Sequence, residues 1–419
     1  MKLELTSARI HLIKEALPRW CEQFKHACIL DSNYMASACD FDTYELLAGI
    51  ADANARVFNH TNLLHENDGW KLGYVSYEDN HALHGINETQ KSKIGFDSCF
   101  FFEPQILLII RKNSNEIEIL GAEASLLDEI INSPPTKTNK SAIDLISRTS
   151  KSEYLSNVEE IKEQIKVGDF YELNYCIEFY SENAEIASPE VFQRLRNISP
   201  TPFSCYLKQD HKHLLSASPE RFLKREKQNM IAQPMKGTIR RGLDSHEDKM
   251  LKEVLLHSEK ERAENIMIVD LMRNDLARCS ETGSVIAKEL LGLYTFATVH
   301  QLISTITATL TKDISTHEIL SHTFPMGSMT GAPKREVIHT INKYEKTARG
   351  LFSGSVGYIS PTHDFDFNVV IRSIQYNAEN HYLSYFVGSA ITYEANAEQE
   401  YHECLLKTKT MFDALEVKS

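Results

Sequence analysis

The feature that most constrains how this chain can fold is a polar stretch at residues 132–140, which contains two adjacent prolines. Proline interrupts helices and cannot donate to a sheet ladder, so such a stretch is typical of a connection. It separates residues 1–131, where no reactive cluster is apparent, from residues 141–419, which hold nearly all candidate functional residues. Because 419 residues are enough for two or three domains, the stretch by itself predicts a domain boundary.

Both parts contain the mixture of patterns that is typical of an α/β protein. Apolar residues at helical spacing predict helices at residues 43–57, 152–166, 189–198, 246–276 and 396–415. Short apolar or alternating runs predict strands at residues 70–77, 100–102, 105–111, 116–120, 170–180, 204–208, 213–218, 366–375 and 381–387, and residues 294–310 contain a β-branched run.

Charge and cysteine usage exclude several classes of protein. Lys and Arg number 45 against 58 Asp and Glu, which leaves a net charge of −13 and disfavours a nucleic-acid partner. The eight cysteines form no C-x-x-C pair, so a zinc site is not expected. No apolar run approaches the ~18 residues of a membrane span, and we expect a cytoplasmic protein with reduced thiols.

One lysine stands in an unusual local sequence. Lys236 lies between Pro234, whose φ is restricted, and Gly237, which permits conformations that a side chain forbids. Thr238 and two arginines follow, so the segment can present an amine and further donors to an anionic small molecule. The alternative is an ordinary solvated basic turn, because exposed Lys and Arg are common on every surface.

Two pairs of glutamates share one spacing. Glu261 and Glu264 are three residues apart, as are Glu400 and Glu403, and residues at this spacing lie on one face of a helix. Lys407 extends the second face by one turn. Four convergent carboxylates need a cation, and a donor set made only of oxygens suits Mg²⁺. The alternative for each pair alone is a solvated helix face.

Three further residues are candidates for function. Glu220 follows a proline at a predicted strand end, where it could serve as a general acid. Arg372 follows the apolar run 369–371, where a charge without an anionic partner is costly. His300 lies in another apolar run, where a structural role is the common alternative.

Several ordered motifs resemble those of chorismate-utilising enzymes. They lie at residues 218–222 (Ser-Pro-Glu-Arg-Phe), 234–238 (Pro-Met-Lys-Gly-Thr), 260–265, 270–276, 330–334, 371–373 and 400–403. The resemblance covers residues 150–415 densely and extends back to residues 69–77. Within this family the chain most resembles the chorismate subunits of aminodeoxychorismate synthases, and next those of anthranilate synthases.

The resemblance implies an α/β (α+β) fold with two antiparallel sheets packed face to face and helices outside. The sheets enclose chorismate and Mg²⁺ within a single large unit. Residues 1–131 would then form the N-terminal part of the sheet sandwich and residues 141–419 the catalytic region. The stretch at 132–140 becomes a loop within one domain.

The resemblance also implies a set of site residues. Glu264 and Glu403 would bind Mg²⁺ directly, with Glu261 and Glu400 acting through waters. Glu220 would assist departure of the 4-hydroxyl of chorismate. The residues implied to contact or surround the substrate are Arg372, Lys407, Thr238, His300, Gly388 and Ser328.

Lys236 distinguishes members of the family, because anthranilate synthases carry alanine at this position. Its amine is implied to attack C2 of chorismate and expel the C4 hydroxyl, after which ammonia adds at C4. Such an amine must be neutral, so we expect its pKa to be lowered by burial or by Arg240 and Arg241. Isochorismate and salicylate synthases instead carry a lysine at the position of Glu172, which argues against water as the nucleophile here.

The implied activity is that of a Mg²⁺-dependent transferase of the transaminase or amidotransferase type. It converts chorismate and ammonia to 4-amino-4-deoxychorismate, an early step towards 4-aminobenzoate and folate. The expected partner is a separate glutamine amidotransferase subunit. Anthranilate synthase component I and a non-catalytic subunit of the same fold remain the alternatives.

Five positions depart from the family pattern. Glu172 replaces the usual glutamine, Phe352 a common tyrosine and Ser328 the usual threonine. Ser389 and Ala390 replace smaller residues beside Gly388. The added Cβ atoms are expected to crowd a substrate carboxylate.

Overall fold

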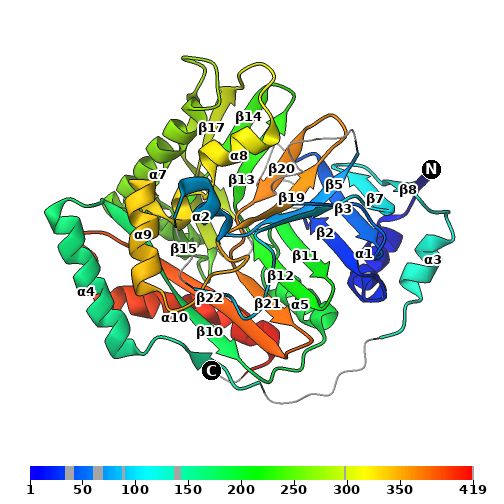
Figure 1. Ribbon diagram of the computed structural model, residues 1–419, viewed down its shortest axis with the longest axis horizontal. Helices are drawn as coiled ribbons and strands as arrows, with labels where there is room; N and C mark the ends of the chain where they lie inside the picture. The colour runs from blue at the N-terminus through cyan, green and yellow to red at the C-terminus, as the bar shows by residue number, and fades with distance from the viewer. Residues whose placement is uncertain (34–41, 60–68, 87–89, 136–142, 297–298, 418–419) are drawn as a thin grey trace.

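The computed structural model describes residues 1–33, 42–59, 69–86, 90–135, 143–296 and 299–417, and two large antiparallel sheets dominate this part of the chain (Figure 1). The first sheet has 12 strands in the described residues. In spatial order they are β1 (Lys2–Glu4), β8 (Glu116–Leu120), β7 (Ile106–Arg111), β3 (Tyr44–Ala51), β2 (His26–Asp31), β11 (Phe203–Gln209), β12 (Lys212–Ser218), β21 (Ser373–Asn377), β22 (Tyr382–Ile391), β10 (Glu172–Ser181) and β18 (Gly331–Ala332), with β9 (Ile146–Ser147) paired to β10.

The second sheet has 10 strands in the same described ranges. Their order is β15 (Met235–Arg240), β17 (Val299–Thr309), β14 (Asn229–Gln233), β13 (Arg221–Glu226), β20 (Phe365–Asn368), β19 (Ser355–Ile359), β5 (Lys71–Val75), β6 (Cys99–Phe102) and β4 (Val57–Phe58), with β16 (Ile286–Thr295) paired to β17. Both sheets therefore contain strands from before and after the polar stretch at 132–140, of which residues 136–140 lie outside the described part.

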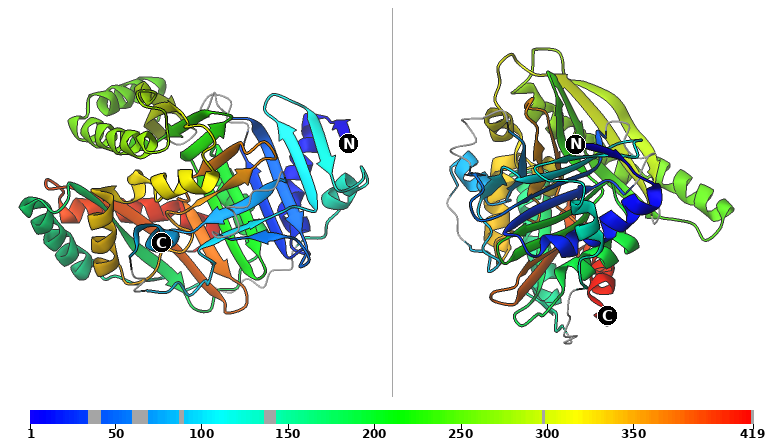
Figure 2. Two further views of the ribbon diagram at one scale, coloured as in Figure 1. Left: turned by 45° about the horizontal axis from the view of Figure 1, so that its top comes forward. Right: turned by 90° about the vertical axis from the view of Figure 1, so that its right-hand side faces the viewer.

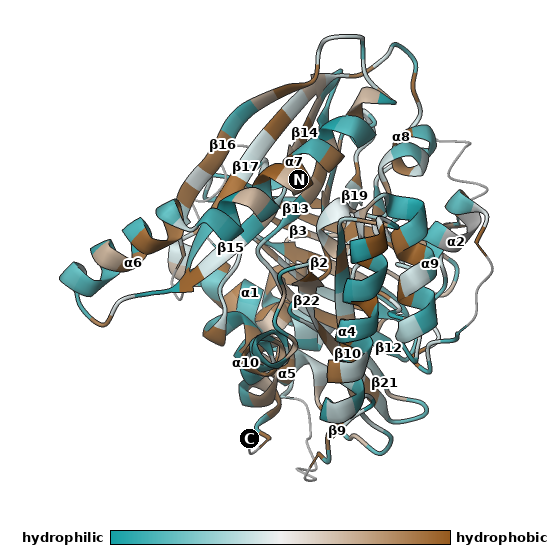
Figure 3. Ribbon diagram, turned by 90° about the vertical axis from the view of Figure 1, so that its left-hand side faces the viewer, coloured by the Kyte–Doolittle hydropathy of each residue, from teal (hydrophilic) through white to brown (hydrophobic). Residues whose placement is uncertain are grey.

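Helices cover the outer faces of the sheets (Figure 2). They are α1 (Ser7–Cys21), α2 (Asp79–His84), α3 (Leu126–Ile131), α4 (Lys151–Val167), α5 (Ser188–Ile198), α6 (Ser245–His257), α7 (Glu259–Ala277), α8 (Thr316–Thr323), α9 (Lys334–Tyr344) and α10 (Ala397–Leu415), with a 3₁₀ turn, η1 (Gly327–Met329). α1, α5 and α10 pack on the first sheet, and α7 packs on β15, β16 and β17 of the second. α6 projects from the body of the protein (Figure 3).

Apolar side chains from the two sheets meet in a shared core. Leu47 of the first sheet lies in one buried cluster with Leu72 and Tyr74 of the second. A separate, larger cluster lies between the first sheet and its helices. This arrangement confirms the predicted α/β fold of two face-packed antiparallel sheets with helices outside. Among the described helices, none combines the length and apolar composition that crossing a membrane requires.

The helix predicted at residues 43–57 is wrong, because the chain forms strand β3 there. Leu46, Ala48 and Ile50 face the helical layer, whereas Leu47 and Ala51 face the second sheet. A strand buried on both faces is apolar at nearly every position, so its sequence also satisfies a helical period.

Two other predicted elements are divided in the structure. The helical region 246–276 breaks at Ser258, whose hydroxyl accepts a hydrogen bond of 3.4 Å from the Glu261 amide and caps α7. The strand predicted at 366–375 becomes β20 and β21, separated by residues 369–372. Arg372 lies in this break with a φ of 49°.

Candidate active site

Lys236 lies in a β-bulge rather than in a free turn. Met235 pairs with Ile303 and Thr238 with Gln301, so Lys236 and Gly237 together oppose the single residue Leu302. Bulges of this kind redirect a side chain and are frequent beside active sites. Gly237 has a φ of 96°, and a Cβ there would lie 3.2 Å from Glu261 and Leu302 side-chain atoms. A glycine is therefore required for the chain to bend here.

The carbonyl group that the bulge removes from the ladder is bound by Asn265. Its amide nitrogen donates to the carbonyl oxygens of Lys236, at 3.1 Å, and Leu302, at 3.3 Å. The Ser304 hydroxyl donates to the Asn265 side-chain oxygen at 2.6 Å. Asn265 is buried, and it thus holds the backbone that presents Lys236. The sequence analysis missed this role, although Asn265 directly follows Glu264.

The amine of Lys236 is held between two carboxylates. Nζ donates to Oε1 of Glu172 at 3.0 Å and lies 3.7 Å from Oε2 of Glu264. Burial disfavours the ammonium form, but Glu172 and Glu264 outweigh burial and hold the pKa of Lys236 above its ordinary value. The expected lowering of this pKa is therefore wrong. Arg240 and Arg241 are instead paired with Glu247 and Asp248.

The two pairs of glutamates do lie on α7 and α10 as expected, but lysines are interleaved among them. Nζ of Lys260 lies 3.1 Å from Oε1 of Glu400 and 3.9 Å from Oε1 of Glu264. Nζ of Lys407 lies 2.7 Å from Oε1 of Glu403. No set of three or more His, Cys, Asp or Glu side chains in the described ranges is arranged to hold a metal ion.

The burial and the pKa shifts of these carboxylates nevertheless favour binding of a cation. Burial raises the pKa of Glu264 to about 7, and burial also raises the pKa of Glu261. At Glu403, burial is outweighed by the ammonium of Lys407, so its pKa is lowered. Oε1 of Glu264 is buried and accepts no hydrogen bond from the residues that the structure describes. An all-oxygen donor set with such an unsatisfied atom fits Mg²⁺.

Glu220 occupies a site suited to a general acid. The side chain is buried, and Oε1 accepts a hydrogen bond of 2.8 Å from the hydroxyl of Ser328 in η1. Burial raises the pKa of Glu220 to about 7, against the effects of Ser328, the Met235 amide and the charge of Lys236. A carboxyl with this pKa is protonated in a large fraction of molecules near neutrality, so it can donate a proton. The structure thus brings Ser328 and Glu220 together beside the bulge.

Arg372 is a cation for which the described residues provide no anionic partner. The Ala217 amide donates to the Arg372 carbonyl at 3.1 Å, and the Val369 amide donates to the Glu220 carbonyl at 3.0 Å. The residue therefore lies beside the strand end that carries Glu220. Burial lowers the pKa of Arg372, and no ion pair within the described part of the chain compensates it. A group of this kind favours binding of an anion.

The strand end at Gly388 shows which departures from the family pattern affect the site. The Gly388 carbonyl accepts a 2.7 Å hydrogen bond from Lys407, and a Cβ at this position would lie 2.5 Å from Sγ of Cys176. The hydroxyl of Ser389 forms a 2.8 Å hydrogen bond with Tyr154 in the helical layer. Since successive residues of a strand face opposite ways, Ala390 alone shares the face of Gly388. The expected crowding by Ser389 is therefore wrong.

Phe352 stacks on Phe386 with ring centroids 5.3 Å apart.

Two of the expected substrate-contacting residues make other contacts in the structure. Both ring nitrogens of His300 are bound, Nδ1 to the Thr295 hydroxyl at 3.0 Å and Nε2 to Asp248 at 2.9 Å. Thr238 is exposed, and its hydroxyl accepts a 3.2 Å hydrogen bond from Gln301. Their roles towards a substrate stay predictions.

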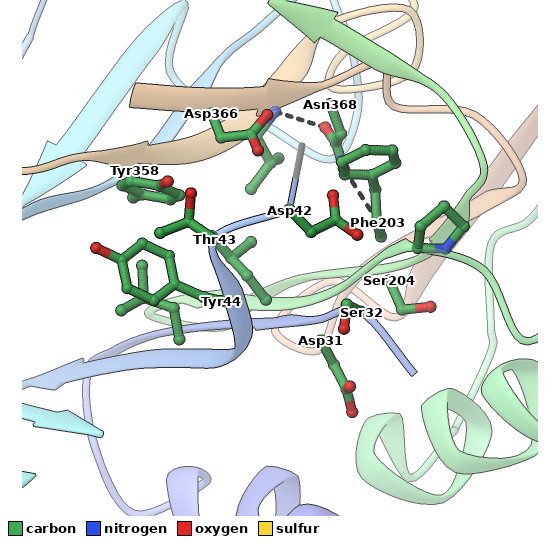
Figure 4. A pocket seen from close by; sticks show the side chains of 14 residues that line it. Asp31, Ser32, Asp42, Thr43, Tyr44, Phe203, Ser204, Tyr358, Asp366 and Asn368 are labelled. Carbon is green, nitrogen blue, oxygen red and sulfur yellow. Dashed lines mark hydrogen bonds between the residues drawn. The ribbon is translucent and has the colours of Figure 1, made fainter. Parts of the chain in front are cut away.

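A separate cavity of about 60 Å³ is lined by residues of both sheets (Figure 4). Asp31, Asp42 and Asp366 contribute carboxylates to its lining, and Arg221 pairs with the last two. The lining contains no residue that the sequence analysis assigned to the site. The candidate active site is therefore the set of residues around Lys236 and Glu220.

Comparisons with known proteins match most of the chain. The model of the family described as chorismate binding enzyme matches residues 24–413. Aminodeoxychorismate synthase from Arabidopsis thaliana, a chloroplastic protein, is 34% identical over 76% of this chain and 37% of its own length. Aminodeoxychorismate synthase component 1 from Bacillus subtilis is 29% identical over 83% of this chain and 77% of its own length. Anthranilate synthase component 1 from Saccharolobus solfataricus also matches, with 31% identity over 84% of this chain and 81% of its own length.

Among solved structures, anthranilate synthase component I from Streptococcus pneumoniae superposes with a TM-score of 0.71 at 25% identity. The match covers 82% of this chain and 80% of that one. Several relatives are much longer than the aligned region, and the chain spans half or less of the length of those from Arabidopsis thaliana and Streptomyces griseus.

Proposed function

Because the chain belongs to the family of chorismate binding enzymes, we propose that it aminates chorismate at C4 with ammonia to give 4-amino-4-deoxychorismate. This is an early step towards 4-aminobenzoate and folate. The observation that carries the proposal is the amine of Lys236. It is presented by a bulge with its backbone bound to Asn265, beside a buried carboxyl whose pKa is raised to about 7. A nucleophile next to a proton donor suits displacement of a hydroxyl group.

Each residue of the site has a separate role in the proposed reaction. Nζ of Lys236 first gives up a proton through Glu172, which accepts its hydrogen bond at 3.0 Å, and then forms a bond to C2 of chorismate. The ring double bonds shift, and the C4 hydroxyl leaves as water with a proton from Glu220. Ammonia then forms the bond to C4, and Nζ leaves C2. Arg372 and Lys407 bind the carboxylates of chorismate, and the backbone at Gly388 completes the binding surface.

Mg²⁺ is the cofactor that suits the carboxylates of α7 and α10. Glu264 and Glu403 would hold it directly, with Glu261 and Glu400 contributing through waters. When bound, Mg²⁺ would attract the ring carboxylate of chorismate and offset the repulsion among the glutamates. For Mg²⁺ to bind in this way, Glu264 and Glu400 would have to separate from Lys260.

Arg372→Met is expected to raise the KM for chorismate by about tenfold or more, because a charge-assisted hydrogen bond contributes roughly 1.5–3 kcal/mol. The same variant should keep or raise its melting temperature, since it removes a partly buried charge for which the described residues provide no ion pair. Arg349→Met is the matched control, because this buried guanidinium binds Glu345 and its loss should lower the melting temperature. Unchanged KM in Arg372→Met would remove Arg372 from the substrate site.

The proposed partner is a separate glutamine amidotransferase subunit that supplies ammonia. The purified chain should therefore form the 4-amino product from chorismate, Mg²⁺ and an ammonium salt, and should not use glutamine. Product identification by mass spectrometry and chromatography tests this directly. Glutamine hydrolysis by the chain alone would contradict the division between subunits.

Two alternatives give different products in the same assay. Anthranilate synthase component I would yield anthranilate, and the lysine at position 236, where those enzymes carry alanine, argues against it. A non-catalytic subunit would consume no chorismate. The presence of Glu220, Lys236 and the four glutamates in one region argues against that alternative.

A further inference from the structure

The second carboxylate oxygen of Glu172 is an acceptor that receives no hydrogen bond from the described residues. The side chain is 1% exposed, and Oε1 accepts the hydrogen bond from Lys236. Oε2 is buried and accepts no hydrogen bond within the described ranges of the chain. Leaving such an atom without a donor is unfavourable, because the atom gives up its hydrogen bonds to water on burial. Unsatisfied buried groups of this kind often belong to functional sites.

The backbone holds this carboxylate in place. Glu172 begins β10 and pairs with Ala332 of β18, and the Tyr171 amide donates to the Ala332 carbonyl at 2.8 Å. A Cβ on Gly331 would lie 1.9 Å from the Glu172 carbonyl oxygen, so the two strands pack with no room between them. Glu172 therefore cannot move away from Lys236 through a shift of its own strand.

During the reaction, Glu172 loses the nitrogen donor that it contacts in the structure. In the structure the carboxylate faces the ammonium of Lys236, and Glu264 is the other carboxylate within 4 Å of that amine among the described residues. In forming the adduct, Nζ releases two protons to the solvent through Oε1 of Glu172, so the ring-bound nitrogen is a neutral secondary amine and the Glu172 carboxylate loses its cationic partner. Chorismate brings further carboxylates, which Glu172 repels. The remaining reactant with N–H donors is ammonia.

We propose that Glu172 binds the ammonia nucleophile, with Oε2 accepting its hydrogen bond in the covalent intermediate. This inference rests on the proposed function and assigns the position of its second substrate. Ammonia and the ammonium group of a lysine side chain offer the same N–H donors, so one buried carboxylate can serve both in turn.

In the second half of the reaction, protons are transferred through the two carboxylate oxygens of Glu172. The nitrogen lone pair of ammonia forms the bond to C4, the ring double bonds shift, and the bond between C2 and Nζ breaks with its electron pair leaving on Nζ. Nζ recovers through Oε1 the two protons that it released to the solvent when it attacked. The new C4 amine gives one proton to Oε2. Water from the solvent carries that proton on and restores the proton that Glu220 lost to the leaving hydroxyl.

The test separates the two halves of the reaction. The covalent adduct is first formed with chorismate and Mg²⁺ without ammonia, and it is then mixed with increasing ammonium chloride while mass spectrometry follows its decay. In Glu172→Gln the half-saturating ammonium concentration should rise about tenfold or more, because the amide keeps the shape but lacks the charge and the proton acceptor. Glu178→Gln is the matched control, since this buried glutamate of the same strand contacts Tyr382 and Ser384 instead.

A second measurement covers the case in which Glu172→Gln accumulates too little adduct. The steady-state KM for ammonium should rise in Glu172→Gln and be partly restored in Glu172→Asp, with the KM for chorismate within about twofold of wild type in both. Equal ammonium dependence in wild type and Glu172→Gln would overturn the inference. So would slow adduct formation followed by decay at the wild-type rate, because Glu172 would then act only on Lys236.

Failure of the proposed function gives a different result. A wild-type chain that forms no 4-amino product with saturating ammonium would contradict the proposed function, and the inference about Glu172 with it. A wild-type chain that aminates chorismate, combined with an unaltered Glu172→Gln, contradicts the inference alone.

Discussion

Lys236→Ala should lose nearly all formation of 4-amino-4-deoxychorismate, by about 10³-fold or more. This corresponds to ~4 kcal/mol of transition-state stabilisation. The reason is that the variant removes the atom that forms the bond to C2, while the Gly237 bulge and its Asn265 contact remain. Lys236→Arg should fail almost as completely, because a guanidinium keeps the charge but stays protonated and cannot attack. Lys409→Ala, on the exposed face of α10, is the control for loss of a lysine.

Mass spectrometry gives an independent measurement of the same role. Wild type incubated with Mg²⁺ and chorismate, but without ammonia, should carry an adduct on Lys236, and Lys236→Ala should carry none. Trace amination at C2 is also expected in Lys236→Ala, since alanine is the residue that anthranilate synthases have there. Formation of 4-amino-4-deoxychorismate by Lys236→Ala at the wild-type rate would show that the lysine serves only as a binding cation.

Glu264→Gln should abolish Mg²⁺-dependent turnover, to less than about 1% of wild type, which is ~2.7 kcal/mol or more in activation free energy. Glu264 combines a buried oxygen that accepts no hydrogen bond from the described residues with a pKa of about 7, so a cation that bound there would stabilise its charged form. The amide of glutamine fills the same space but brings no negative charge. Glu403→Gln should have the same effect from α10.

The metal assignment is checked by titrating Mg²⁺ against turnover and, separately, by calorimetric binding of Mg²⁺ to the protein. Glu259→Gln is the control, because Glu259 is exposed on the first turn of the same helix α7. Circular dichroism should show the same fold for all variants. Normal activity of Glu264→Gln at low Mg²⁺ would rule out the assignment.

Local sequence patterns predicted most elements near the site correctly. The spacing of Glu261 and Glu264, and of Glu400 and Glu403, placed each pair on a helix that the structure contains. The main error, a helix at 43–57, arose because β3 is covered on both faces and its sequence is apolar at nearly every position. A strand with one solvated face, such as β8, alternates and was recognised.

The sequence by itself determined which candidate reactive residues the protein has: a lysine between Pro234 and Gly237, an acid at Glu220 and paired glutamates on helices. These depend on residue identity and on spacings within one turn of chain. The tertiary structure alone decided that Glu172 meets Lys236 across 64 residues and that Asn265 holds the bulge. It also decided the direction of the pKa shift of Lys236, because that shift is a balance between burial and the charges of residues distant in sequence. A short stretch of sequence shows neither how deeply Lys236 is buried nor that Glu172 and Glu264 lie beside it.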